Sequence, residues 1–95
     1  MQRNRRKIAR SLLAKGFQLE QHHRDHDYYF FVVNDEVTPI YTKLSRGRKY
    51  KTLGDDLLTA MSRQLHLSKG QFDKLIACPW DRARYTRHLR SEGKI

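Results

Sequence analysis

Residues 28–33 read Tyr-Tyr-Phe-Phe-Val-Val, the longest unbroken apolar run of the chain. Aromatic and β-branched side chains pack well on a pleated sheet and lose rotamer freedom in a helix, so the run predicts a strand. Before it, residues 17–23 alternate with period two and predict a shorter, half-buried strand. After it, β-branched residues at 37–44 predict a third strand, in which Pro39 indicates a sheet edge because proline cannot donate to the ladder. Short connections favour an antiparallel meander.

A helix is predicted on each side of the strands. From Arg5 to Lys15, apolar residues fall on one helical stripe, and Gly16 supplies the left-handed conformation that ends helices most cheaply. Residues 52–65 begin with a Thr-x-x-Asp capping signature and continue with apolar residues at helical spacing. The order helix, three strands, helix predicts an α+β fold with both helices on one face of a three-stranded antiparallel sheet.

A short helical extension is predicted after this core. Ser68 and Gln71 repeat the capping signature before a third helix that Pro79 closes, and Asp81 can cap a last, strongly basic helix. Because no repeat or linker divides the chain, residues 1–95 are interpreted as a single domain.

Composition excludes several classes of protein. The chain has 95 residues with 20 Lys and Arg against 10 Asp and Glu, a formal net charge of +10, which favours a polyanionic partner. Its longest apolar run is far shorter than the roughly 20 residues of a membrane-spanning helix, and cations interrupt the segment where a signal peptide needs an apolar core. Cys78 is the sole cysteine, so we expect no internal disulfide, and the cytoplasm is the expected location.

The cations are concentrated in three blocks, residues 1–15, 43–51 and 81–95. Blocks of like charge on a small fold are tolerable when a polyanion neutralises them, although each alone is also compatible with a solvated surface. The middle block has no acids, and its residues 45–51 predict an exposed loop that contains a glycine. It supplies the predicted phosphate contacts: Lys43, Arg46, Arg48, Lys49 and Lys51.

Histidines and acids are concentrated at the junction of the first two predicted strands, where the sequence reads His-His-Arg-Asp-His-Asp. His26 stands between Asp25 and Asp27, and a neighbouring carboxylate can orient an imidazole for general-base work. One base is enough to activate a ribose 2′-hydroxyl toward the adjacent phosphate, a route that DNA lacks. The alternatives are a surface histidine satisfied by Asp25 or water, and a zinc site that also uses His22. Cys78 is interpreted as a small buried hydrophobe.

Two longer runs of the sequence resemble a known protein family. The runs RRKIARSLLAKGF and TLGDDLLTAMSRQLHLS, with a histidine early in the hairpin and a basic loop between, are similar to HicA toxins over residues 5–68. The resemblance implies a fold like that of double-stranded RNA-binding domains and cleavage of mRNA by one histidine without a metal or other cofactor. In that family the histidine follows Gly-Ser shortly after a Gly-Phe pair; here the matching histidine is His26, preceded by Arg24 and Asp25.

The resemblance also implies partners. A HicB-type antitoxin would cover the basic, histidine-bearing surface, and DNA would be contacted only through such a complex. Residues 69–95 extend beyond the HicA-like core and bring their own basic helix, which could add RNA-binding surface or cap the sheet.

Two other hypotheses remain open from the residues. One is a nucleic-acid-binding module without chemistry that uses the same charge to grip a duplex. The other is a helix-turn-helix DNA binder, with residues 52–65 as the first helix and residues 68–77 as the reader, although only Lys69 and Lys74 are cationic on that reader.

Overall fold

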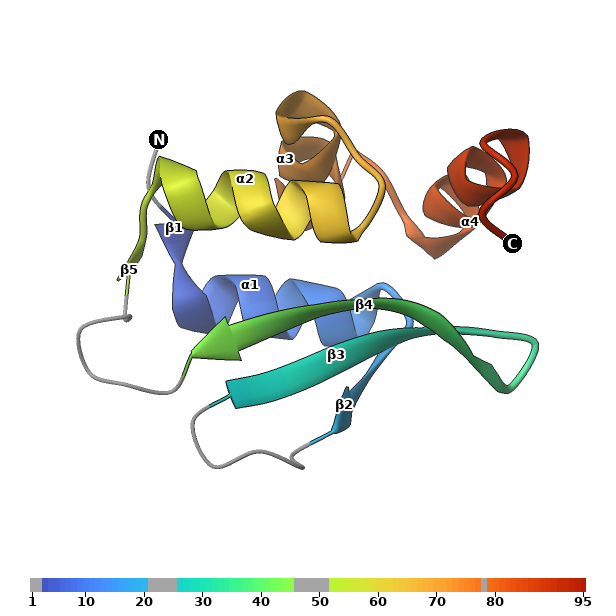
Figure 1. Cartoon of the computed structure of the whole chain (residues 1–95), viewed down its shortest axis with the longest axis horizontal. Coiled ribbons are helices and arrows are strands. Elements are labelled where there is room, and N and C mark those ends of the chain that lie inside the picture. The colour runs from blue at the N-terminus through green and yellow to red at the C-terminus, as the bar shows by residue number, and fades with distance from the viewer. Residues whose placement is uncertain (1–2, 21–25, 46–51, 78) are drawn as a thin grey trace.

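A computed structural model describes residues 3–20, 26–45, 52–77 and 79–95. The described elements are β1 (Arg3–Asn4), α1 (Arg5–Ala14), β2 (Phe17–Glu20), β3 (His26–Val33), β4 (Glu36–Ser45), β5 (Thr52–Leu53), α2 (Asp55–Gln64), α3 (Lys69–Ala77) and α4 (Arg82–Ser91). Strands β2, β3 and β4 form an antiparallel sheet in that order, and β1 pairs separately with β5 (Figure 1). The predicted α+β class and the order helix, three strands, helix are confirmed. Within the described residues, every helix is too short or too polar to cross a bilayer.

The sheet has β3 at its centre. Phe17 of β2 lies opposite Phe31, and Tyr29 lies between Leu19 of β2 and Thr42 of β4. The run 28–33 is therefore a strand paired on both sides, as predicted. Strand β4 forms an edge of the three-stranded sheet, which confirms the placement of Pro39. The strand predicted over 17–23 is observed as far as Glu20, and residues 21–23 lie outside the described part.

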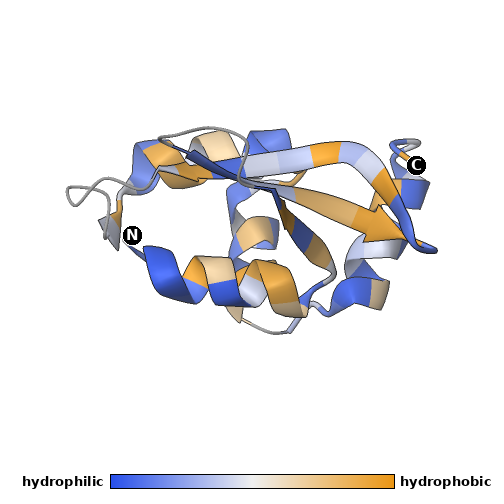
Figure 2. Cartoon of the chain, turned by 90° about the horizontal axis from the view of Figure 1, so that it is seen from below, coloured by the Kyte–Doolittle hydropathy of each residue, from blue (hydrophilic) through white to orange (hydrophobic). Residues whose placement is uncertain are grey.

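The two faces of the sheet differ in burial. One face contributes side chains to a core that the helices complete; its strand members are Phe17, Tyr29, Phe31, Ile40, Thr42 and Leu44. Helix α1 packs behind this face with Ile8 and Leu12 fully buried, and α2 packs along β4 (Figures 1 and 2). The odd-numbered residues of β3 therefore face the helices, because successive side chains of a strand alternate between faces.

Helix α1 has the predicted extent. The side chain of Asn4 accepts hydrogen bonds from the backbone amides of Arg6 and Lys7, which caps the N-terminus. At the other end Gly16 has a φ of 94°, in the left-handed region that favours glycine. A Cβ at this position would lie 2.6 Å from Nε of Arg82, so the absence of a side chain also leaves room for the Arg82 side chain.

The start of α2 differs from the prediction. Thr52 is not its capping residue: Thr52 and Leu53 form β5, which pairs with Arg3 and Asn4. The helix begins at Asp55 after Gly54, and no side-chain hydrogen bond caps it. An extended Thr52 that pairs with another strand lies two residues too early to serve as the cap.

The C-terminal caps agree with the sequence. The amide of Ser68 donates to Oε1 of Gln71 at 2.9 Å, and the amide of Gln71 donates to Oγ of Ser68 at 3.1 Å. This reciprocal pair is a capping box. Asp81 accepts from the amide of Arg84 at 2.8 Å and so caps α4.

Helix α4 contributes to the main core through Tyr85. Its side chain is fully buried, and its ring lies 4.8 Å from that of Phe31 and 5.9 Å from that of Phe17, centroid to centroid. The hydroxyl donates to the carbonyl oxygen of Leu65 at 2.8 Å. Residues of the C-terminal extension thus cover one end of the sheet.

The first prediction concerns Tyr85. Burial raises the pKa of its hydroxyl above the ordinary 10.0. The stabilising contribution of this group is therefore complete below pH 10 and is lost above it, because the unfolded chain ionises first. We expect Tyr85→Phe to cost about 1 kcal/mol at pH 8, from the lost hydrogen bond. This deficit should shrink or disappear at pH 11, since the variant has no hydroxyl to ionise.

Urea denaturation at pH 8 and at pH 11 measures the free energy of unfolding of the parent and of Tyr85→Phe. Tyr41→Phe, at a half-exposed tyrosine on the other face, is the matched control and should stay within about 0.5 kcal/mol of the parent at both values. A deficit of Tyr85→Phe that widens with pH would contradict the assignment.

A second prediction concerns Gly16. We expect Gly16→Ala to lower the free energy of unfolding by about 1–2 kcal/mol, the cost of a left-handed conformation for a residue with a Cβ. Gly70→Ala is the control, because Gly70 lies in α3 with nothing within 4 Å of an added Cβ. Gly70→Ala should match or slightly exceed the parental free energy of unfolding in the same denaturation experiment. Equal losses of stability in the two variants would contradict a specific cost of the left-handed conformation at Gly16.

Candidate functional site

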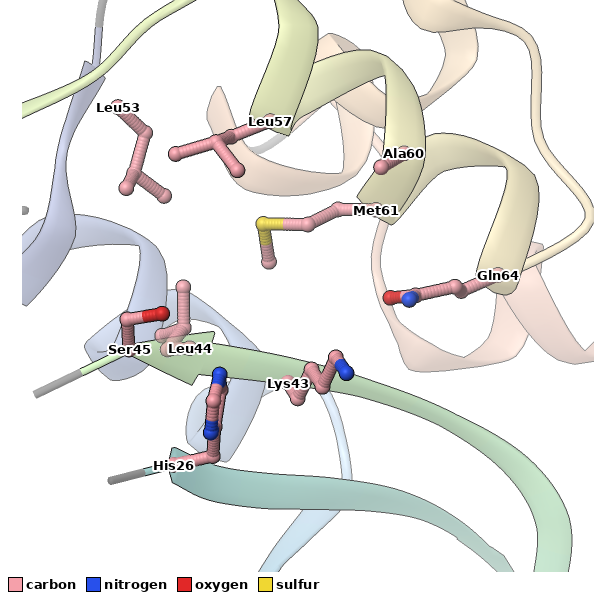
Figure 3. Close-up of a pocket in the computed structure, with 9 residues that line it drawn as sticks. All are labelled: His26, Lys43, Leu44, Ser45, Leu53, Leu57, Ala60, Met61 and Gln64. Carbon is pink, nitrogen blue, oxygen red and sulfur yellow. The ribbon is translucent and has the colours of Figure 1, made fainter.

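A small pocket opens between the edge strand β4 and helix α2, and His26 lies at its rim (Figure 3). Its volume is about 130 Å³. The lining combines polar side chains at the sheet with an apolar wall from α2 and β5: His26, Lys43, Leu44, Ser45, Leu53, Leu57, Ala60, Met61 and Gln64. Imidazole, ammonium, hydroxyl and amide groups therefore converge on one opening.

The pairing of β3 with β4 brings the polar groups together. His26 is the first residue of β3 and lies opposite Ser45, the last residue of β4. One row further along the ladder, Tyr28 lies opposite Lys43. Because residues i and i+2 of a strand share a face, His26, Ser45 and Lys43 lie on the same side of the sheet, opposite the core. Figure 3 shows the imidazole in front of β4, directed toward the space below α2.

Two contacts from the helices hold this corner of the sheet. Nη1 of Arg5, the first residue of α1, donates to the carbonyl oxygen of Ser45 at 2.7 Å. Oγ1 of Thr42, fully buried, donates to Oε1 of Gln64 on α2 at 2.6 Å. Both the end of β4 and the amide at the far side of the pocket are therefore fixed by buried or half-buried partners.

Asp27, the acid that follows His26, belongs to the helix-covered face of the sheet. Asp27 lies opposite Leu44, on the face that the helices cover. The pKa of the Tyr29 hydroxyl is raised by burial and then by the charge of Asp27, and Arg5 lowers it, so these three residues are neighbours on that face. Of the two acids that flank His26 in the sequence, Asp27 thus lies on the other face of the sheet, because adjacent residues of a strand point to opposite faces. Asp25 lies outside the described residues.

The predicted phosphate contacts are placed only in part. Lys43 is exposed and lines the pocket beside His26. Arg46, Arg48, Lys49 and Lys51 lie outside the described residues, so their contacts stay predictions. Ser45 and Leu53, which flank this basic segment in the chain, both line the pocket.

The zinc site considered as an alternative, and the burial expected for Cys78, involve residues that the structure does not describe. His22, His23 and Cys78 lie outside the described part of the chain. Among the residues that are described, no group of three or more histidine, cysteine or carboxylate side chains is arranged to hold a metal ion.

Several cations outside the middle block have structural partners. Arg3 pairs with Asp73 of α3, and Nζ of the buried Lys15 donates to the carbonyl oxygen of Trp80 at 2.5 Å. Nη2 of Arg82 donates to the carbonyl oxygen of Val32 at 2.7 Å. The blocks at 1–15 and 81–95 therefore hold the fold together in part. Helix α4 also lies at the other end of β4 from the His26 pocket, so its arginines are not part of this site.

The sequence analysis did not identify Gln64 as a pocket residue or Phe30 as a residue of the open face. Gln64 reaches the pocket from α2, a placement that depends on how the helix packs and leaves no signal in the sequence. Phe30 lies on the open face with Tyr28 and Tyr41, whereas Tyr29 is in the core. Strand alternation over 28–31 is the signal that could have separated these rings.

Comparison of the chain with models of known protein families, with curated proteins and with solved structures found no match.

Proposed function

We propose that the chain is a HicA-like, metal-independent endoribonuclease in which His26 is the general base. The observation that carries the proposal is the convergence of the His26 imidazole, the Lys43 ammonium and the Ser45 hydroxyl at one open pocket between the edge strand β4 and helix α2. The resemblance of residues 5–68 to HicA toxins independently selects the same histidine. We further propose that it acts in the cytoplasm, where mRNA is the substrate.

The proposed reaction needs only the substrate and side chains. The imidazole of His26 removes the proton of a ribose 2′-hydroxyl, and the resulting oxygen attacks the adjacent phosphorus. The bond from phosphorus to the 5′-oxygen breaks, giving a 2′,3′-cyclic phosphate and, after protonation by the imidazolium or water, a 5′-hydroxyl. Lys43 supplies positive charge where the phosphoryl oxygens gain negative charge. The Ser45 hydroxyl can hydrogen-bond the same oxygens.

A binding module without chemistry is the competing hypothesis, and it makes a different use of the same charge. It requires the cations and gives no role to His26. The helix-turn-helix hypothesis is less well supported, because Lys69 of the supposed reader is paired with Asp55 at 2.9 Å and Asp73 with Arg3. Phe72, Leu75 and Ile76 of the same helix are buried. Lys69 and Lys74 of α3 are both exposed, but Lys69 is paired and Asp73 adds negative charge between them, so the helix is a poor surface for a DNA groove.

The resemblance also supports a partner. We propose that an acidic antitoxin of the HicB type covers the pocket and blocks cleavage. A net charge of +10 and the exposed Lys43 favour an acidic partner by charge complementarity.

The central prediction concerns His26. In EDTA, purified parent chain should cleave labelled RNA, and His26→Ala should cleave it at least 100-fold more slowly, since general-base catalysis contributes about 10²–10⁴-fold. RNA binding by the variant should stay within a few-fold of the parent. An oligonucleotide with a 2′-deoxy sugar at the cleavage position should resist the parent. Equal cleavage by parent and His26→Ala would refute the catalytic assignment, and tight binding with no cleavage by either would favour the binding module.

A further prediction distinguishes a local role of Lys43 at the pocket from the effect of the overall positive charge of the protein. Lys43→Ala and Lys74→Ala each remove one exposed cation, but Lys74 lies on α3 away from the pocket. We expect Lys43→Ala to lower the single-turnover cleavage rate about 10-fold or more at saturating RNA, because Lys43 stabilises the transition state. Lys74→Ala should change that rate less than twofold. Equal effects would mean that Lys43 acts only through the overall field of the protein.

A further inference from the structure

The open face of the sheet carries three aromatic rings in mutual contact. The ring centroids of Phe30 and Tyr41 are 5.3 Å apart, those of Tyr28 and Tyr41 are 5.7 Å apart, and those of Tyr28 and Phe30 are 6.4 Å apart. The Tyr41 side chain is 38% exposed, and the other two are half-buried. We call these three residues the aromatic platform.

The platform lies outside the hydrophobic core. Tyr28 and Phe30 alternate along β3 with Tyr29 and Phe31, which are buried against the helices, and Tyr41 lies opposite Phe30 on β4. In Figure 1 no described helix lies in front of β3 and β4, and α1 lies behind them. Cross-strand pairing of Phe30 with Tyr41 stabilises the sheet, but it does not require a third ring on the solvent side.

The platform is continuous with the His26 pocket. Along β3 the even positions are His26, Tyr28 and Phe30, and along β4 their partners are Ser45, Lys43 and Tyr41. Successive rows of one face are about 7 Å apart, because each residue of a strand rises about 3.4 Å. The nearest ring therefore lies one row from the imidazole, a step comparable with that between successive nucleotides in an extended single strand.

Charged residues on either side of Tyr28 would orient a bound nucleic-acid strand. Lys43 lies opposite Tyr28 on the β4 side, and Glu20 lies opposite Tyr28 on the β2 side. A phosphate backbone is attracted to the first and repelled by the second. Bound nucleic acid would therefore place its phosphates along β4, from Lys43 toward Ser45, and its bases over the rings.

We propose that Tyr28, Phe30 and Tyr41 form a stacking platform for unpaired bases next to the scissile phosphate, so that the strand bound at His26 is single-stranded. The proposal rests on the proposed ribonuclease function. Aromatic side chains beside a cation bind single strands by stacking, which requires bases that are not already paired. In an A-form duplex the base faces are covered by their neighbours, so a flat platform offers them no contact.

The test measures binding without cleavage. Full-length chain carrying His26→Ala is titrated into a fluorescein-labelled 12-nucleotide RNA, either single-stranded or annealed to its complement, and fluorescence anisotropy gives the dissociation constant. Tyr41→Leu and Phe30→Leu remove a π face and keep apolar bulk, whereas Tyr41→Phe keeps the ring. Val37→Ala, at an exposed apolar residue on the same strand, is the control for lost apolar surface. Thermal unfolding by circular dichroism establishes that each variant is folded.

We expect Tyr41→Leu and Phe30→Leu to weaken single-strand binding roughly 5- to 100-fold, the range found when one stacking ring is removed. Tyr41→Phe and Val37→Ala should bind as the His26→Ala parent does, and the duplex should bind more weakly than the single strand. If Phe30→Leu does not fold, the comparison of Tyr41→Leu with Tyr41→Phe alone decides.

Three results would overturn the platform. They are single-strand binding unchanged by Tyr41→Leu, duplex binding at least as tight as single-strand binding, and loss by Tyr41→Leu of self-association in analytical ultracentrifugation while RNA binding persists. The last would identify the rings as a contact between copies of the chain. Failure of the ribonuclease proposal is seen separately: if wild-type chain does not cleave RNA but ring-dependent binding of single strands persists, the platform stands and the catalytic role of His26 falls.

Discussion

The register of β3 between its two neighbours is the constraint on which both faces of the molecule depend. Four consecutive aromatic residues at 28–31 are divided by strand alternation into two pairs. Tyr29 and Phe31 enter the core, and Tyr28 and Phe30 remain on the open face. A slip of one residue would exchange the pairs and would also move His26 to the helix-covered side. The burial of Phe31 against Tyr85 therefore secures the position of the imidazole as well as the core.

Helix α4 stabilises the register of β3 through the contacts of Tyr85. Tyr85 contacts both β2 and β3 through Phe17 and Phe31 and donates to Leu65 at the end of α2. The last helix thus joins the sheet to the second helix at the end of β4 remote from the pocket. The candidate site lies at the other end of β4, where the core residues Leu44, Leu53 and Met61 form part of the pocket wall.

The two proposals assign different tasks to one surface. The pocket at β4 and α2 holds the groups that would act on the ribose and phosphate, and the platform would hold the bases of the same strand. Glu20 lies on one side of Tyr28 and Lys43 on the other, so a bound strand would place its phosphates toward Lys43. The resemblance to HicA toxins concerns the histidine and the order of elements, whereas the platform is argued from the register and ring contacts of this chain alone.

Local sequence determined the element types, the edge position of Pro39 and the caps at Ser68 and Asp81, because each depends on a residue's own backbone preference or on partners three residues away. It also selected His26 as the candidate base. Tertiary structure alone decided that Asp27 faces the core, that Lys15 is buried against Trp80 and that Gln64 reaches the pocket. It likewise replaced the expected Thr52 cap by a strand pair with Asn4. These outcomes depend on which segments distant in the chain come into contact, and a periodicity in one segment does not specify its partner.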